Sequence, residues 1–159
     1  MYKRQRITGD ASANDANHIS GPSRTGEGLY ISIQNALKEA KLNNDQIDYI
    51  TAHGTATPYN DEMEAIAFNR AGLQDVPVNS LKGYYGHTLG ASALIETLIA
   101  KHCLVHNELF ASLGFEALGV SESINVIAKN SKKEIKRVLK TASGFGGCNV
   151  ALIIEKEIL

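Results

Sequence analysis

The sequence feature that most constrains the fold is an alternation of helix-type and strand-type hydrophobic patterns. Between residues 29 and 40, apolar side chains recur at the three- and four-residue spacing of an amphipathic helix. A polar turn follows, and residues 47–52 (IDYITA) then form a short β-rich run. The same order repeats, with a helical pattern near residues 60–71 and a strand-like run at residues 76–79. This alternation predicts a sheet covered by helices.

The remaining segments complete this layout. We expect an edge strand at residues 3–7, followed by a long polar loop from Asp10 to Gly28. Two strands, at residues 137–142 and 150–154, should close the chain as a hairpin. The three helices are expected near residues 26–41, 60–71 and 89–105. The sequence therefore predicts a mixed, mostly parallel sheet of about five strands packed with helices, in one domain spanning residues 1–159.

Composition argues against several classes of function. With 16 Lys and Arg against 17 Asp and Glu, the net charge of -1 offers no support for nucleic-acid or membrane binding. The sequence has no apolar run near the ~20 residues of a membrane span, and its basic first residues lack the apolar core of a signal peptide. Two cysteines, Cys103 and Cys148, fit a reducing compartment better than a disulfide scaffold. We therefore expect a cytoplasmic protein.

The stretch NSLKGYYGHTLGASALI, residues 79–95, is the most suggestive of chemistry. Lys82 and His87 lie in a Gly-containing turn just before a small-residue segment that is typical of a helix start. The positive end of that helix and the charge of Lys82 both favour a neutral His87 imidazole. Glu96, on the same segment, is a candidate partner for Lys82. The competing interpretation is a Gly-rich loop ahead of a buried helix.

Three polar, Gly-containing segments each follow a predicted element: residues 53–57, 82–87 and 144–147. In an open α/β sheet the ends of neighbouring strands converge on one crevice, so these segments can meet. Two histidines and a lysine gathered there would suit stabilisation of an anion or an enolate.

Other candidates carry weaker signals. His102 and His106 have a zinc-type i, i+4 spacing, but the Glu of H-E-x-x-H is missing, so we expect two solvated histidines and no metal site. The segment SGFGGCN lies between two strands without dinucleotide-binding spacing, which favours a hairpin that needs positive φ. Cys148 has no histidine near it in sequence and is interpreted as a small hairpin residue. His18 lies in the long loop and carries no signal alone.

Four segments together resemble one known family. They are ITGDASANDANHISGP, YITAHGTATPYNDEMEA, VNSLKGYYGHTLGASALIE and SGFGGCNVALI. In these segments, and from about Ile7 to Ile154, the chain resembles the C-terminal half of a β-ketoacyl-[acyl-carrier-protein] synthase, the condensing enzyme of fatty-acid and polyketide synthesis. The resemblance implies a thiolase-like fold, in which two similar α/β halves surround one active site and this chain supplies one half.

The resemblance also implies catalytic roles. His53 and His87 match the two active-site histidines, which hold the thioester carbonyl of a malonyl unit and support its decarboxylation. Lys82 matches the active-site lysine, and Glu96 matches the acidic residue associated with it. Neutral imidazole donors would stabilise the enolate more than the ground state.

Further residues match binding positions of the family. Phe145 matches a gating phenylalanine whose backbone N–H is expected in the oxyanion hole. Thr55 and Thr57 match threonines that contact the pantetheine arm of the carrier. The resemblance implies no resident cofactor, because the substrates are carried on the phosphopantetheine of acyl carrier protein. It also implies a homodimeric full-length enzyme.

The chain departs from the family pattern in three places. The family's nucleophilic cysteine belongs to the N-terminal half, and neither Cys103 nor Cys148 lies in a matching motif. Ser143 stands where a phenylalanine is usual, and residues 83–85 (GYY) replace a Ser-Met-Thr type stretch. We therefore expect an acyltransferase domain that is inactive alone and needs its N-terminal half.

Two alternatives remain open at this point. One is a non-catalytic partner like the chain-length-factor subunits, and the other is half of a thiolase-type acyltransferase. Retention of His53, His87 and Lys82 argues against the first, because a chain freed from chemistry need not keep them. The HGTAT segment together with Lys82 favours decarboxylating synthases over thiolases.

Overall fold

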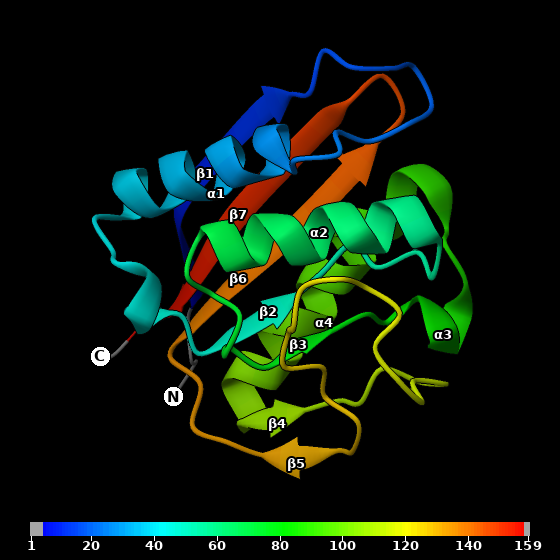
Figure 1. The fold of residues 1–159 in the computed structure, drawn as a ribbon. Helices are drawn as coiled ribbons and strands as arrows, with labels where there is room; N and C mark the ends of the chain where they lie inside the picture. Colours follow the sequence, from blue (N-terminus) through cyan, green and yellow to red (C-terminus); the bar gives the residue numbers. More distant parts are fainter. Residues whose placement is uncertain (1–4, 158–159) are drawn as a thin grey trace.

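The computed structural model describes residues 5–157, and its central layer is a five-stranded sheet (Figure 1). The strands lie in the order β1, β7, β6, β2, β3. Their bounds are β1 Gln5–Asn14, β2 Tyr49–Thr51, β3 Val78–Asn79, β6 Arg137–Gly144 and β7 Cys148–Lys156. The β1–β7 and β7–β6 pairs are antiparallel, whereas β6–β2 and β2–β3 are parallel. The expected mixed five-stranded sheet is confirmed, but within residues 5–157 parallel pairs make up only half of its pairings.

Helices cover both faces of the sheet. Helices α1 and α2 lie on one face, and α4 lies on the other (Figure 1). The bounds are α1 Glu27–Ala40, α2 Pro58–Arg70, α3 Lys82–Tyr85 and α4 Ser92–His106, with short 3-10 turns at Asn44–Gln46 and Leu89–Ala91. The three long helices agree with the sequence expectation to within three residues at each end. Among the described residues, none of these helices has the length and apolarity to cross a membrane.

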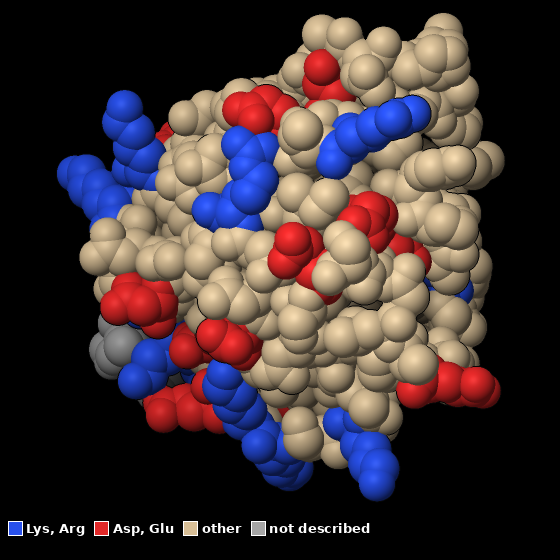
Figure 2. Space-filling view, in the orientation of Figure 1, with Lys and Arg blue, Asp and Glu red and all other residues tan. Residues whose placement is uncertain are grey.

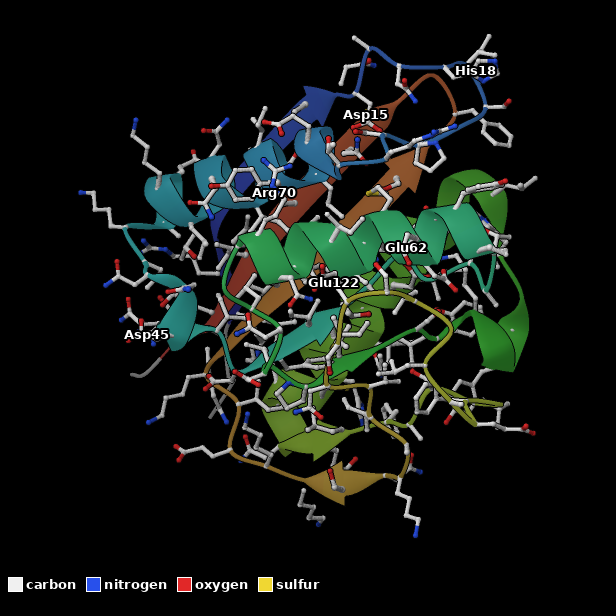
Figure 3. The ribbon with its side chains drawn as sticks, in the orientation of Figure 1. Asp15, His18, Asp45, Glu62, Arg70 and Glu122 are labelled. Carbon is white, nitrogen blue, oxygen red and sulfur yellow. The ribbon has the colours of Figure 1, made fainter. Side chains whose placement is uncertain are left out.

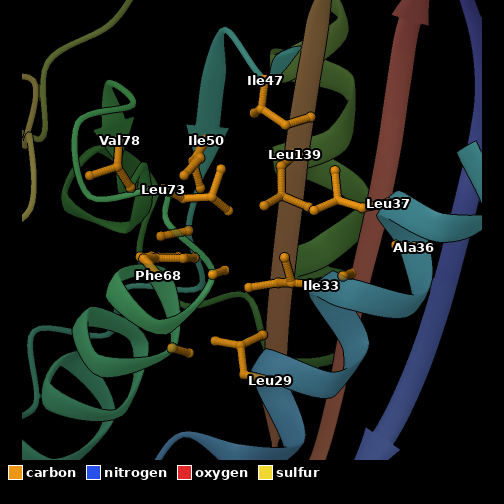
Figure 4. Packing of buried hydrophobic residues seen from close by; sticks show 14 of the residues in the cluster. Leu29, Ile33, Ala36, Leu37, Ile47, Ile50, Phe68, Leu73, Val78 and Leu139 are labelled. Atoms are coloured by element: carbon orange, nitrogen blue, oxygen red, sulfur yellow. The ribbon is translucent and has the colours of Figure 1, made fainter. Parts of the chain in front are cut away.

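Two apolar clusters hold these layers together. In the first, Leu29 and Ile33 of α1 pack with Phe68 of α2 over Ile50 and Leu139 of the sheet (Figure 4). Successive strand residues point to opposite faces of the sheet. The residues next to Ile50 and Leu139 in their strands therefore belong to the second cluster, beneath α4. That cluster contains Tyr49, Ala100, Cys103, Leu104, Leu109, Ile127, Ile135, Val138 and Ile154. Burial on both faces explains why consecutive residues are buried in β2 and at residues 138–141 of β6, without the alternation of a half-exposed strand.

The first strand is longer than expected. The loop predicted from Asp10 instead begins after Asn14, because β1 keeps its antiparallel pairing with β7 as far as Cys148. This edge strand has few buried side chains, so its backbone hydrogen bonds define its length. No apolar pattern in the sequence predicts that length. Gly9 faces α1 so closely that a Cβ would lie 2.2 Å from the backbone oxygen of Ala36. Residues 3 and 4 of the predicted strand lie outside the described residues.

After the helix expected to end near residue 105, the sequence predicts an irregular region at residues 110–133, with only weak strand character at residues 124–127. The structure adds a two-stranded sheet there, formed by β4 (Glu108–Leu109) and β5 (Ser131–Lys132). Val126 makes only an isolated parallel bridge with Val78, so no strand forms at that point. These pairs are too short to leave a periodic signal in the sequence.

Candidate active site

His53 and His87 meet at one end of the sheet. His53 follows β2 by two residues, and His87 follows α3 directly ahead of the turn that leads into α4. Their ring centroids are 5.1 Å apart, with the planes at 77°. Both rings line a cavity of about 820 Å³, together with Phe145 from the turn between β6 and β7. The structure therefore brings together the three residues that sequence analysis placed at one end of the sheet.

The loop after β1 forms another wall of this cavity. It carries Asp15 and His18 and lies beside the β6–β7 turn (Figure 3). The Asp15 N–H donates to the Gly147 carbonyl at 2.8 Å, and the Asp15 carboxylate accepts from the Asn149 side chain at 3.0 Å. His18, which carried no signal in the sequence, is thus placed at the cavity by the loop's hydrogen bonds to the turn.

Phe145 is exposed over 87% of its surface, although it lines the cavity. Other apolar side chains nearby are also exposed, among them Leu89 at 82% and Leu94 at 63%. Figure 2 shows mixed charges over α1 and the β4–β5 edge, but few charged side chains over the α3 end. Exposed apolar side chains from the β6–β7 turn and from the turn before α4, Phe145 and Leu89, therefore flank the cavity.

The backbone at His53 is held by a buried carboxylate. The N–H groups of His53 and Gly54 donate to Glu64 at 2.8 and 2.7 Å, and the Thr141 hydroxyl donates to it at 3.2 Å. Burial raises the pKa of Glu64. Sequence analysis did not single out Glu64, because an acidic residue near a helix start is usually a solvated partner of the helix dipole. Its position on the buried face of α2 is the signal that could have revealed it.

Lys82 joins the catalytic histidine candidate to Glu96. Its Nζ lies 2.6 Å from Glu96 Oε1, so the expected partnership is present. The same ammonium donates to the His53 carbonyl and lies 3.4 Å from His53 Nδ1. Because an ammonium has donors only, Nδ1 is the acceptor of this contact and the proton of a neutral ring resides on Nε2. Lys82 thereby selects one tautomer of His53.

His53 is neutral at physiological pH. Burial lowers the pKa of its imidazole to about 3, and the charges of Lys82, Lys140 and His87 act in the same direction. Sequence analysis argued for a neutral imidazole at His87, from the helix dipole and Lys82. That expectation for His87 stays a prediction, whereas at His53 the cause is a different one, the burial of the ring beside two lysines.

Lys140 is a site residue that sequence analysis missed. It lies on β6 with only 3% of its surface exposed, and its Nζ is 2.6 Å from Glu96 Oε2. It also donates to the carbonyl of Ala52 at 3.3 Å, one residue before His53. Burial lowers the pKa of Lys140, while the charge of Glu96 opposes that change. A lysine within the otherwise apolar run VLKTA was the available signal.

The remaining sequence candidates fall into two groups. Thr55 and Thr57 lie at the cavity, and their hydroxyl oxygens are 2.7 Å apart. Neither cysteine is among the described residues that line the cavity. Cys103 is buried, which raises the pKa of its thiol to about 11, whereas Cys148 is exposed.

The histidine pair on α4 lies away from this cavity. The rings of His102 and His106 are 4.3 Å apart, and both side chains are exposed. His102 has Glu108 at 3.6 Å. Across residues 5–157 no group of three or more His, Cys, Asp or Glu side chains is arranged to hold a metal ion.

The residues that depart from the family pattern lie in α3 and near the end of β6, just before the β6–β7 turn. Tyr84 donates through its hydroxyl to the Ala111 carbonyl at 3.1 Å. Burial and the charge of Glu96 raise the pKa of Tyr85 to about 12. The Ser143 hydroxyl lies 2.7 Å from Asn149 Oδ1 and so helps to tie the turn together. Tyr84 and Ser143 therefore have hydrogen-bond partners, whereas the buried Tyr85 hydroxyl has none among the described residues.

The fold and its cavity define a thiolase-like ketosynthase domain. A beta-ketoacyl synthase from Burkholderia phymatum STM815 superposes with a TM-score of 0.92 at 29% identity, covering 97% of this chain and 38% of that chain. A type II polyketide ketosynthase, solved with its acyl-carrier protein and a bound hexaketide, gives a TM-score of 0.93 at 26% identity, covering 97% of this chain and 39% of that one.

Sequence comparison agrees with the structural one. Residues 5–116 match the family described as "Beta-ketoacyl synthase, C-terminal domain". A putative mitochondrial 3-oxoacyl-[acyl-carrier-protein] synthase of Schizosaccharomyces pombe is 35% identical over 162 residues, covering 94% of this chain and 37% of that protein. The chain therefore belongs to the beta-ketoacyl synthase C-terminal domain family. It spans less than two fifths of the length of each of these three relatives.

Proposed function

We propose that this chain supplies the decarboxylation half of a β-ketoacyl-[acyl-carrier-protein] synthase site, acting on a malonyl thioester. The observation that carries the proposal is the edge-on pair of His53 and His87 at the cavity, with Lys82 bonded behind His53. This arrangement offers imidazole donors to one oxygen atom while the lysine fixes the tautomer of the buried ring.

The proposed reaction begins with loss of carbon dioxide. The bond between the malonyl carboxylate carbon and the α-carbon breaks, and its electron pair moves into an enolate of the thioester. His53 and His87 donate hydrogen bonds to the enolate oxygen, which is more basic than the thioester carbonyl from which it forms. The donors therefore stabilise the transition state more than the ground state, which is the requirement for a faster reaction.

Carbon–carbon bond formation follows in this proposal. The enolate α-carbon attacks the carbonyl of an acyl thioester, and the sulfur leaves as a thiolate. That acyl group is carried by a cysteine of the N-terminal half, since a thiolate nucleophile needs an activating environment. Cys103, whose thiol has a raised pKa, is a poor candidate for this role.

The substrate carrier is proposed to be acyl carrier protein. Thr55 and Thr57, which lie at the cavity, would contact its pantetheine arm, and the exposed Phe145 would gate the entrance. The backbone N–H of Phe145 is proposed to join the oxyanion hole. A polyketide relative solved with its acyl-carrier protein supports this choice of partner. Homodimerisation of the full-length enzyme, the absence of a resident cofactor and a cytoplasmic location remain predictions.

The test measures release of labelled carbon dioxide from malonyl-[acyl carrier protein] by the chain joined to an N-terminal ketosynthase half. His53→Asn and His87→Asn should each lower the decarboxylation rate by roughly 100- to 1000-fold, the usual effect of removing one oxyanion donor. His106→Asn is the matched control, because that histidine is exposed at the far end of α4. Rates within twofold of wild type in both site variants would refute the proposal. The same result would favour a non-catalytic partner subunit.

A further inference from the structure

A second lysine completes the charge network behind the proposed site. Glu96 has no exposed surface, yet it faces two ammonium groups, with Lys82 at Oε1 and Lys140 at Oε2, each at 2.6 Å. Oε1 also accepts from the Ser92 hydroxyl at 3.2 Å. Within residues 5–157, Oε2 accepts no hydrogen bond of good geometry, so its compensation is the ion pair with Lys140. Without Lys140, half of a fully buried carboxylate would be left uncompensated.

The same lysine contacts the backbone that leads to His53. Lys140 Nζ donates to the Ala52 carbonyl at 3.3 Å, while Lys82 donates to the His53 carbonyl. Glu64 accepts the His53 N–H from the opposite side. The peptide groups on both sides of the His53 side chain are therefore held by charged, buried partners from three different elements, which are β6, α3 and α2.

Lys82 has competing demands on its position. It must remain near His53 Nδ1 to keep the ring proton on Nε2, yet Glu96 attracts it strongly. Lys140 occupies the second carboxylate oxygen, so Lys82 binds only Oε1 and keeps its contacts with His53. If Lys140 were neutral, Lys82 could bridge both oxygens of Glu96 and move away from the imidazole.

We infer that Lys140 is a positioning residue of the proposed decarboxylation site, which holds Glu96 and the Ala52 peptide so that Lys82 keeps His53 in the Nε2–H tautomer. This role rests on the proposed function. It is not a catalytic role, because Lys140 is absent from the described residues that line the cavity.

Charged groups on every neighbouring element affect the two residues. Lys82 and His87 face His53, and Glu96, Lys82 and Glu64 face Lys140. Lys140 contributes to the lowered pKa of His53, so removing its charge should raise that pKa. A lysine that only filled space in the core would leave the titration of His53 unchanged.

The test is NMR of the 159-residue chain labelled with ¹⁵N at histidine. Long-range ¹H–¹⁵N spectra report the tautomer and the titration midpoint of each imidazole. In wild type, His53 should show a protonated Nε2 and no titration between pH 5 and 8. In Lys140→Met the midpoint should rise by about one pH unit or more, and a mixture of tautomers should appear. Lys136→Met is the matched control, since Lys136 is an exposed lysine just before the same strand.

Two further variants separate positioning from packing. Lys140→Arg keeps the charge and should restore the Nε2–H tautomer that Lys140→Met loses. Lys140→Met added to Glu96→Gln should leave the His53 tautomer as it is in Glu96→Gln alone, because the positional effect passes through Glu96, whereas the direct effect of the Lys140 charge on the midpoint should persist. An unchanged His53 spectrum in Lys140→Met would overturn the inference. So would a Lys140→Met chain that folds only when Glu96→Gln is added, because Lys140 would then be merely a counter-ion for folding.

A rate measurement distinguishes this inference from the proposed function. In the chain joined to an N-terminal half, Lys140→Met should lower kcat for decarboxylation about tenfold or more, with KM changed less than twofold. A shifted His53 spectrum without any effect of His53→Asn on the rate would refute the proposed function alone. Loss of rate in His53→Asn with a wild-type spectrum and rate in Lys140→Met would refute the role of Lys140 alone.

Discussion

The stability of the chain should depend on pH through His53. Its pKa is about 3 in the folded protein, against 6.5 for an unperturbed histidine, and burial is the largest cause. Between these two values the unfolded chain binds a proton that the folded chain excludes. Stability from the neutral ring is therefore fully present above pH 6.5 and is lost as the pH falls toward 3. His53→Asn removes this dependence.

The magnitude follows from the difference between the two pKa values. At 1.36 kcal/mol per pH unit, the whole difference corresponds to about 5 kcal/mol. Lowering the pH from 7.5 to 4.5 covers about two pH units below 6.5. Before any reduction for solvent screening, this interval corresponds to a loss of about 2.7 kcal/mol in the free energy of unfolding. Part of the ring reaches the cavity, and screening there reduces the expected loss to about 1.5 kcal/mol.

The assay is urea unfolding followed by circular dichroism at pH 7.5 and 4.5. Wild type should lose about 1.5 kcal/mol more free energy of unfolding than His53→Asn over this interval. Glu64, whose raised pKa acts in the opposite direction, is present in both chains and cancels in the comparison. His106→Asn, at an exposed histidine, should behave as wild type. Equal losses in wild type and His53→Asn would refute the argument that a buried neutral imidazole opposes acid.

Three other outcomes are expected. Glu96→Gln should destabilise the chain by about 3 kcal/mol in urea unfolding, because two buried lysines lose their counter-ion. Glu122→Gln, at an exposed position, should not destabilise it. Equal losses of unfolding free energy in the two variants would contradict the buried pairing. The isolated chain should form no extended product from acyl- and malonyl-[acyl carrier protein], and stable acylation of Cys103 followed by extension would overturn that expectation. The isolated chain should self-associate through its exposed apolar surface, so its mass in light scattering should exceed that of a monomer. The double substitution Leu94→Glu with Leu98→Glu should reduce that mass. A monomeric mass for the wild-type chain would count against this expectation.

The parts of the fold that periodicity specifies could be predicted. Helix α1 was recognised because its buried residues recur on one face, and the β6–β7 hairpin because two apolar runs flank a Gly-rich turn. Strand β1 was cut short because its pairing with β7 depends on backbone hydrogen bonds, to which polar side chains add no pattern. The share of parallel strand pairs is lower than the sequence predicts, because the direction of each strand depends on how distant segments of the chain return to the sheet.

Some residues of the candidate site could likewise be predicted from the sequence, and others could not. The roles of His53, Lys82, His87 and Glu96 could be predicted because these residues lie in short motifs that resemble those of the condensing-enzyme family. Lys140 could not, since its counter-ion lies 44 residues earlier on α4 and only the packing of α4 on β6 joins the two. A lysine in a strand is usually solvated, so its burial could not be read without knowing that both faces of β6 are covered.

The arrangement of charges explains how a buried polar site can favour a neutral donor. Glu96 and Glu64 balance the formal charges of Lys82 and Lys140, but Glu96 is shared between both lysines and Glu64 is engaged by backbone N–H groups. The imidazole of His53 therefore experiences two nearby ammonium groups while the carboxylates are directed elsewhere. A proton on both ring nitrogens is disfavoured, yet an oxygen that becomes negative beside Nε2–H is favoured by the same positive surroundings. A histidine held in this way would stabilise the proposed enolate more than the neutral thioester, and this is the ground for proposing a positioning role for Lys140, which lies outside the cavity.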